Sequence, residues 1–282
     1  MSEKTKGMLA ILMATCVWGG GFVALSKSLE TVDTMALLAV RFSLAALIML
    51  ALFFKEIKTI QWKEFKQGIP SGFCLFMGFT TQSFALKLTT VANNAFLSAL
   101  NVIFTPYFLW FIYKKHPGKK IFMASLLALI AVGFLTLNSA GLALNLGTVL
   151  SLIDAVFFSL HLIFSSRMKG SSVKLITFIQ FSVTAGLAFL ACFLSGARIA
   201  FHTPLEIGLL VYLTLFSTIM CYVLQIYGIK RLPASLAAII LTSEAMFATF
   251  FASIFLHEAL TLNILVSMIL LISAVRLATK RD

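Results

Sequence analysis

Two stretches of this chain decide its fold: QSFALKLTTVANNAFLSALN at residues 82–101 and QIYGIKRLPASLAAIILTSE at residues 225–244. Shifting the sequence by 143 residues aligns them without a gap and places Asn101 on Glu244. A glutamine and a lysine coincide at the same offset, and each stretch has a short polar break between apolar runs. The alignment predicts that the chain is built from two related halves.

The composition around these stretches is that of a membrane protein. Of the 282 residues, 60% are hydrophobic and only 11% are charged, whereas a soluble domain carries about 25% charged residues. Apolar runs near twenty residues recur along the chain, and each could cross roughly 30 Å of hydrocarbon as a helix. Runs such as MASLLALIAVGFLTL do not alternate every second residue, so the sequence favours helices over strands.

Segmentation by apolar runs and polar breaks predicts ten helices, at approximately 7–26, 34–54, 68–86, 91–113, 119–137, 145–166, 173–195, 206–228, 234–255 and 262–279. If the N-terminus is cytoplasmic, the outer loops contain only Lys27, Lys87 and Arg198, Arg41 lies within a helix, and every other Lys and Arg falls on the inner side. This asymmetry predicts a multi-pass protein of the cytoplasmic (inner) membrane with both termini in the cytoplasm. Because orientation accounts for the net charge of +12, we expect no nucleic-acid partner.

Five helices per half is an odd number, so the second half would enter the membrane in the opposite direction from the first. The sequence therefore predicts an all-α membrane protein with ten transmembrane helices in two inverted-topology five-helix repeats, residues 1–140 and 141–282. Two such halves can exchange conformations around a central site. The repeat thus favours a transporter that works by alternating access.

Several other functional classes lack their sequence signals. The chain contains no GxxxxGK[ST] nucleotide motif, no nucleophile–base–acid arrangement, and no Cys or His spacing typical of a metal site. We expect no cofactor, no metal and no enzymatic activity, and a gradient of the substrate or of protons would drive transport. The expected partners are a small-molecule substrate, protons as a candidate coupling ion, and the lipid bilayer. We expect the protein to be a monomer or a homodimer.

Four segments resemble the drug/metabolite transporter (DMT) superfamily, specifically its EamA-type branch: CVWGGGFVALSK at 16–27, LLAVRFSLAAL at 37–47, ALNVIFTPYFLWFIYKKHPGKK at 99–120 and LTSEAMFATFFASIFLHEAL at 241–260. The resemblance covers essentially the whole chain. It implies two inverted five-helix halves, a central cavity, and export of small metabolites, often amino acids. One departure is the pair Glu244-Ala245, where members of the family commonly have a proline after the glutamate.

We expect the substrate or proton site among polar and aromatic residues inside the helices: Glu244, Asp154, Arg41, Gln180, Asn101, His161, Trp18 and Tyr222. Ionisable groups are costly in hydrocarbon and therefore candidates for function. Glu244 would bind a substrate amine or a proton, and Arg41 a substrate carboxylate. As structural alternatives, Glu244 would bond a neighbouring helix, and Arg41 would pair with an acid or extend toward the interface.

Asp154 and His161 lie seven residues apart and hence on one helix face, where they could serve as an acid and a proton relay. Alternatively, Asp154 would lie near the outer headgroups and His161 would be a satisfied interior side chain. The amides could bind an uncharged substrate or join helices, and the aromatic residues could form walls around a cation.

The sequence therefore predicts a secondary transporter that exports a small organic metabolite, an amino acid or a related compound. Efflux of lipophilic cations is the alternative within transport. A membrane enzyme or a lipid-handling protein is the less favoured alternative from another class.

Overall fold

The computed structural model contains helices and no strands in its described residues, which are 1–114, 116, 118–136, 145–168, 170–259 and 262–279. The helices follow in the order α1 Glu3–Ser28, α2 Thr34–Ile57, α3 Trp62–Leu86, α4 Val91–Ser98, α5 Asn101–Tyr113, α6 Lys119–Thr136, α7 Leu146–Arg167, α8 Val173–Ser195, α9 Pro204–Tyr212, η1 Leu213–Met220, α10 Cys221–Ile229, α11 Ala234–Leu241, α12 Ser243–Phe255 and α13 Leu262–Thr279. The all-α prediction is confirmed. The boundary expected between residues 140 and 141 lies outside the described residues.

Seven segments within the described ranges are long and apolar enough to cross a membrane: Glu3–Ser28, Thr34–Ile57, Val91–Tyr113, Leu146–Arg167, Val173–Ser195, Pro204–Ile229 and Ala234–Phe255. Three of these combine consecutive elements, namely α4 with α5, α9 with η1 and α10, and α11 with α12. Each of these three spanning segments is therefore longer than the separate helices that form it.

Helix α3 begins six residues earlier than the sequence predicts. Its first turn, WKEFKQ, is polar and reads as a loop, but the carboxylate of Glu64 accepts a hydrogen bond of 3.1 Å from the backbone N of Gln61. This bond satisfies one of the free donors at the helix start. The helix consequently begins at Trp62 and carries Pro70 inside it.

Two of the predicted helices, 91–113 and 234–255, are each broken within their length. The first breaks between α4 and α5, where the N of Val102 donates to the O of Ala99 at 3.1 Å. The second breaks between α11 and α12, where the N of Ala245 donates to the O of Thr242 at 3.2 Å. Such bonds over three residues tighten the helix locally. Ala99 and Thr242 are 143 residues apart, the offset that aligns the two opening stretches.

A third predicted helix, 206–228, contains the π-helix η1. Within it the hydroxyl of Thr218 donates back to the carbonyl of Leu213, five residues earlier, at 2.8 Å. The wider turn changes which side chains face the neighbouring helices. Periodicity along the sequence does not reveal this change, and π-helical turns are frequently found at functional sites.

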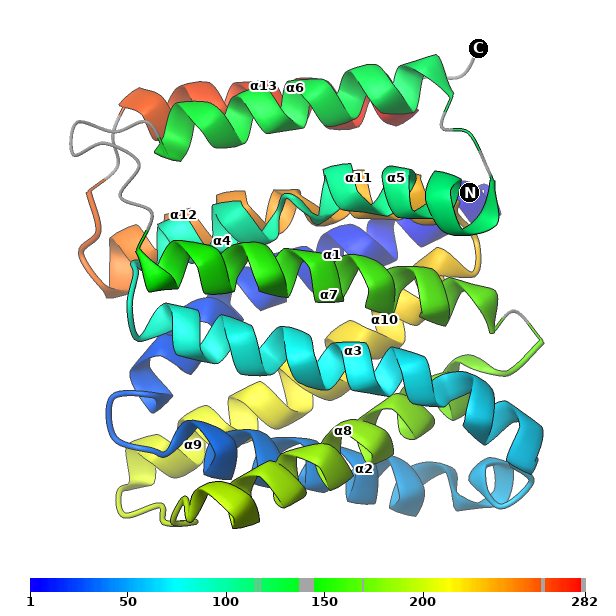
Figure 1. Cartoon of the computed structure of the whole chain (residues 1–282), viewed down its shortest axis with the longest axis vertical. Coiled ribbons are helices and arrows are strands. Elements are labelled where there is room, and N and C mark those ends of the chain that lie inside the picture. The colour runs from blue at the N-terminus through cyan, green and yellow to red at the C-terminus, as the bar shows by residue number, and fades with distance from the viewer. Residues whose placement is uncertain (115, 117, 137–144, 169, 260–261, 280–282) are drawn as a thin grey trace.

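The helices pack side by side with alternating direction, and α1 begins at the same end at which α13 ends (Figure 1). Helices α2 and α8 pack together at one edge of the molecule, and α6 and α13 pack together at the opposite edge. Between these pairs, α3 packs on α7 and α1 packs on α10 and α12. The broken helices α4–α5 and α11–α12 lie between the α6–α13 pair and α7 (Figure 1).

Candidate functional site

A central cavity lies where the broken helices meet α1, α2, α3, α7, η1 and α10. About 710 Å³ of space lies between its lining atoms, including the open space at its mouth. Six of the eight predicted site residues line it: Trp18, Arg41, Asn101, His161, Tyr222 and Glu244. Residues far apart in the sequence therefore meet around one cavity.

Arg41 lies in α2 with only 1% of its surface exposed, so it does not extend toward the membrane interface. Its Nε donates to the hydroxyl of Thr218 at 2.6 Å and its Nη2 to the hydroxyl of Ser217 at 3.3 Å. The guanidinium also lies 4.6 Å from the ring centre of Phe79, at cation–π distance. Its Nη1 has no hydrogen-bond partner. Arg41 therefore presents a cation and a free donor at the cavity wall.

Glu244 lies in the first turn of α12, directly after the break at Thr242. Its side chain is half-buried and lines the cavity. Within the described part of the chain it makes no hydrogen bond and no ion pair, either with Arg41 or with a neighbouring helix. The structure thus places an unpaired carboxyl group and a guanidinium without an acidic partner among the described residues in the lining of one cavity.

Asn101 begins α5, directly after the break in the first half. It lines the same cavity as Glu244, and its Oδ1 has no hydrogen-bond partner. The amide of Gln225, which also lines the cavity, likewise has an Oε1 without a partner. These oxygens are acceptors that a bound ligand could satisfy.

His161 lines the cavity, and Gln180 lies behind it. The Nε2 of His161 is 3.0 Å from the Oε1 of Gln180, and the hydroxyl of Ser71 donates to the same oxygen at 3.4 Å. The two residues are about 1% exposed. The expectation that Gln180 lines the cavity is therefore wrong. Helix α8 directs this side chain toward Ser71 on α3 and His161 on α7 instead.

Asp154 also lies behind the cavity wall rather than in it. It is fully buried in α7. Its Oδ1 accepts a hydrogen bond of 2.7 Å from Ser98, which does line the cavity. Its Oδ2 lies 3.4 Å from the Nδ2 of Asn94. Asp154 reaches the cavity only through Ser98.

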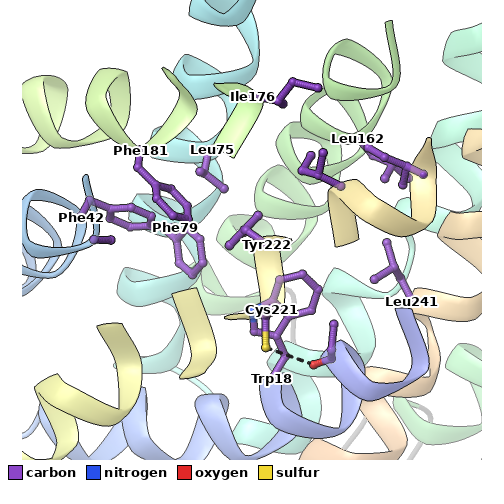
Figure 2. Packing of buried hydrophobic residues seen from close by; sticks show 14 of the residues in the cluster. Trp18, Phe42, Leu75, Phe79, Leu162, Ile176, Phe181, Cys221, Tyr222 and Leu241 are labelled. Atoms are coloured by element: carbon purple, nitrogen blue, oxygen red, sulfur yellow. Dashed lines mark hydrogen bonds between the residues drawn. The ribbon is translucent and has the colours of Figure 1, made fainter. Parts of the chain in front are cut away.

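Aromatic rings form the apolar part of the wall, and Tyr222 is at their centre (Figure 2). Its ring centre is 5.1 Å from that of Trp18, 5.6 Å from that of His161 and 6.2 Å from that of Phe79. The indole of Trp18 donates to the carbonyl of Ser217 at 2.6 Å. This bond fixes the indole next to the partners of Arg41.

Sequence reasoning missed four residues that complete the site: Ser98, Phe79, Ser217 and Thr218. Ser217 and Thr218 form a polar pair inside an apolar run, and Ser98 precedes Asn101 by three residues, on the same helical face. These two signals were available. Nothing in the sequence distinguishes Phe79 from the other phenylalanines.

Comparison with known proteins identifies the family. The model of the EamA-like transporter family matches residues 5–137 and, a second time, residues 145–280. The chain belongs to the EamA-like transporter family. The resemblance expected from the sequence motifs is confirmed, and the protein is a transporter rather than an enzyme.

Relatives of this EamA-like transporter carry the same general description. An uncharacterized transporter of Archaeoglobus fulgidus is 29% identical over 255 residues, which cover 90% of this chain and 79% of the relative. A second from the same organism is 25% identical and covers 100% of this chain and 99% of its own length. One from Clostridium kluyveri is 24% identical and covers 94% of this chain and 88% of the relative.

A protein of known crystal structure shares the fold with a TM-score of 0.80, covering 98% of this chain and 96% of the other. The sequence identity of 18% limits the likeness to the fold. With the family and the seven apolar segments, these findings make the EamA-like transporter an integral membrane protein.

Proposed function

We propose that this EamA-like transporter exports a small zwitterionic metabolite, an amino acid or a related compound, across the cytoplasmic membrane by alternating access. The observation that carries the proposal is the pair of unpaired charges in one cavity. Arg41 would hold the substrate carboxylate, because its guanidinium has a free donor there. Glu244 would hold the substrate amine, because its carboxylate has no partner within the described residues.

The remaining lining would select the rest of the substrate. Asn101 and Gln225 offer free acceptors to further donors of the substrate. Trp18 and Tyr222 would form an apolar wall against the side chain of the substrate. His161 packs on Tyr222 in the same wall. Gln180 and Asp154 bond His161 and Ser98, respectively, from behind the wall.

The architecture we propose is ten membrane-spanning helices in two inverted five-helix halves, residues 1–140 and 141–282, with both termini cytoplasmic. Helix contacts support this arrangement, because they occur in matched pairs. If the two halves are exchanged, α1 takes the place of α7, α2 of α8, α3 of α10 and α6 of α13. The α3–α7 contact then becomes the α1–α10 contact, and the α2–α8 and α6–α13 contacts are each unchanged. The two matches of the family model and the distribution of Lys and Arg support it as well.

Alternating access would use the breaks in α4–α5 and α11–α12. These breaks occupy equivalent positions in the two halves and place Asn101 and Glu244 at the cavity. A broken helix can pivot at its break while both parts keep their internal hydrogen bonds. The two halves could then exchange roles and open the cavity first to one side and then to the other.

Efflux of a lipophilic cation is the rival function. The aromatic rings of Trp18, Tyr222 and Phe79, together with Glu244, favour it. Arg41 disfavours it, because a buried guanidinium without an acidic partner repels a cationic ligand. A substrate that brings its own carboxylate satisfies Arg41 and is the better match.

Uptake into proteoliposomes tests the proposal. Labelled amino acids and labelled quaternary amines are compared in vesicles with and without a pH gradient. The proposal predicts transport of at least one amino acid, with the apparent KM raised in Arg41→Gln and in Glu244→Gln. The loss of one hydrogen bond to a charged group, ~1.5–3 kcal/mol, corresponds to about 10- to 150-fold.

Two exposed residues supply matched controls, Arg198→Gln and Glu30→Gln, which should leave the apparent KM unchanged. Transport of quaternary amines alone would establish the rival function. Transport of neither class would contradict both.

A further inference from the structure

Asp154 has a carboxylate that no cation neutralises in the described part of the chain. The side chain is 0% exposed, in the middle of a membrane-spanning segment. Its hydrogen-bond donors are the neutral groups of Ser98 and Asn94. An ionised carboxylate in such surroundings is costly unless it is neutralised. The residue therefore requires either a bound cation or a proton.

The hydrogen-bond donors around Asp154 favour a proton over a metal ion. Both carboxylate oxygens already face a donor, at 2.7 Å from Ser98 and 3.4 Å from Asn94. Asn94 donates in addition to Ser151 at 2.8 Å, and the hydroxyl of Ser151 donates to the carbonyl of Gly147 at 2.9 Å. Of this cluster only Ser98 borders the cavity. A sodium ion would need several free oxygens and room between them, whereas a proton needs neither.

The charged groups near Asp154 are few. Glu244, on α12, is the other carboxyl group of the site, because it lines the cavity that Ser98 borders. Helices α4, α5, α10 and α11 contain no ionisable acid or base apart from the thiol and phenols of Cys and Tyr. The charged residues of α3 lie in its first turns, and His161 lies two turns away on α7 itself. Two ionised carboxylates around one cavity would repel each other, and a proton on Asp154 would remove that repulsion.

We propose that Asp154 is the proton-binding residue of this transporter and that Ser98 conveys its protonation state to the cavity, where the proton competes with the substrate amine. A hydronium ion in the cavity gives its proton to the Oγ of Ser98, and the Ser98 hydroxyl passes its own hydrogen to the Oδ1 of Asp154. An O–H bond forms at Asp154, the O–H bond of Ser98 is replaced, and a water molecule remains in the cavity.

The competition follows from the direction of one hydrogen bond. While Asp154 is charged, Ser98 donates to it and offers its lone pairs to the cavity. Once Asp154 is protonated, its O–H donates to Ser98, whose hydroxyl then points a hydrogen into the cavity. Because α4 packs against α12, this change happens on the side of Glu244, where the amine would bind. Proton binding would then displace the amine, as proton-driven export requires.

The proton site can be tested without a known substrate. The infrared difference spectrum of the reconstituted protein between alkaline and acid pH reports the carbonyl stretch of a protonated buried carboxyl group. We expect this band in the wild type and in Glu244→Gln, its loss in Asp154→Asn, and a shift in Ser98→Ala, which keeps Asp154 but removes its nearest donor. Persistence of the same band in Asp154→Asn would overturn the proposal. A spectrum that responds to Na⁺ at constant pH, instead of to pH, would replace the proton by a metal ion.

The competition rests on the proposed function and is tested by exchange of labelled amino acids at equal pH on both sides. In the wild type, acid should raise the apparent KM, by about 5- to 150-fold for a coupling of usual size. The side chain of Asp154→Asn is neutral at every pH. The apparent KM of this variant should therefore equal, at every pH, the apparent KM of the wild type at acid pH. Asp33→Asn, at an exposed position, is the matched control and should keep the wild-type profile. An unchanged profile in Asp154→Asn would refute the competition. If no amino acid is transported, the proposed function fails, while the infrared result still decides the proton site.

Discussion

Gly19 lies where α1 crosses α12, and replacing it with alanine is the sharpest test of how these helices pack. A Cβ atom at this position would lie 2.7 Å from the backbone N of Ala248 and 2.7 Å from the backbone C of Phe247, and would also collide with the Cβ of Phe247. Backbone atoms cannot rotate away as the end of a side chain can. The two helices would have to move apart, next to the turn that carries Glu244.

The expected cost can be worked out from two opposing effects. Overpacking of a close contact costs ~1–3 kcal/mol, and the contact with backbone places Gly19→Ala toward the upper end. Alanine recovers ~1 kcal/mol, because it is the better helix former. We therefore expect a net loss of ~1–2 kcal/mol. At about 2–4 °C per kcal/mol, the apparent Tm should fall by several degrees.

The buried thiols provide the assay. Cys74, Cys192 and Cys221 are free and buried, so a thiol-reactive fluorophore reports unfolding on heating. Gly186→Ala is the control, because a Cβ there would meet nothing within 4 Å, and its Tm should stay the same or rise slightly. A Gly19→Ala protein as stable as Gly186→Ala would refute the close contact between α1 and α12.

Two further substitutions test side-chain hydrogen bonds. The carboxylate of Glu258 accepts from the backbone N of Val91 at 3.1 Å and of Ala92 at 3.2 Å, so Glu258→Ala should lower the stability by ~1 kcal/mol, as the loss of a helix cap does; an unchanged Tm in the same thermal assay would contradict this. Trp18→Phe keeps the ring contact with Tyr222 but removes the bond to the Ser217 carbonyl. It should cost ~1 kcal/mol and raise the apparent KM for amino acids, and transport kinetics identical to the wild type would exclude a role for this bond.

The sequence predicted the all-helical class correctly, because an apolar run of membrane length leaves the backbone little alternative to a helix. It also predicted the family, since the motifs at 16–27 and 241–260 are local in the chain. The predicted start of α3, residue 68, was wrong by six residues, because the side chain of Glu64 in the first turn caps the helix at Trp62. Strong local signals were thus read correctly, and capping by a polar turn was not.

The arrangement of the site could be predicted only in part. Arg41, Glu244 and Asn101 are rare polar residues in apolar runs, and they therefore stand out in the sequence alone. Whether such a side chain faces a cavity depends on contacts between distant segments, such as the bond from Arg41 to Thr218. The π-helix that presents Thr218 and the turn of α8 that hides Gln180 leave no periodic trace in the sequence.

The measurement that tests the central claim most directly compares one amino acid with its two charge-deleted analogues in proteoliposomes. The carboxamide lacks the carboxylate, and the N-acetyl derivative lacks the amine. The wild type should prefer the amino acid to both. Arg41→Gln should lose only the preference over the carboxamide, and Glu244→Gln only the preference over the N-acetyl derivative. If both variants keep both preferences, Arg41 and Glu244 do not bind the two ends of the substrate.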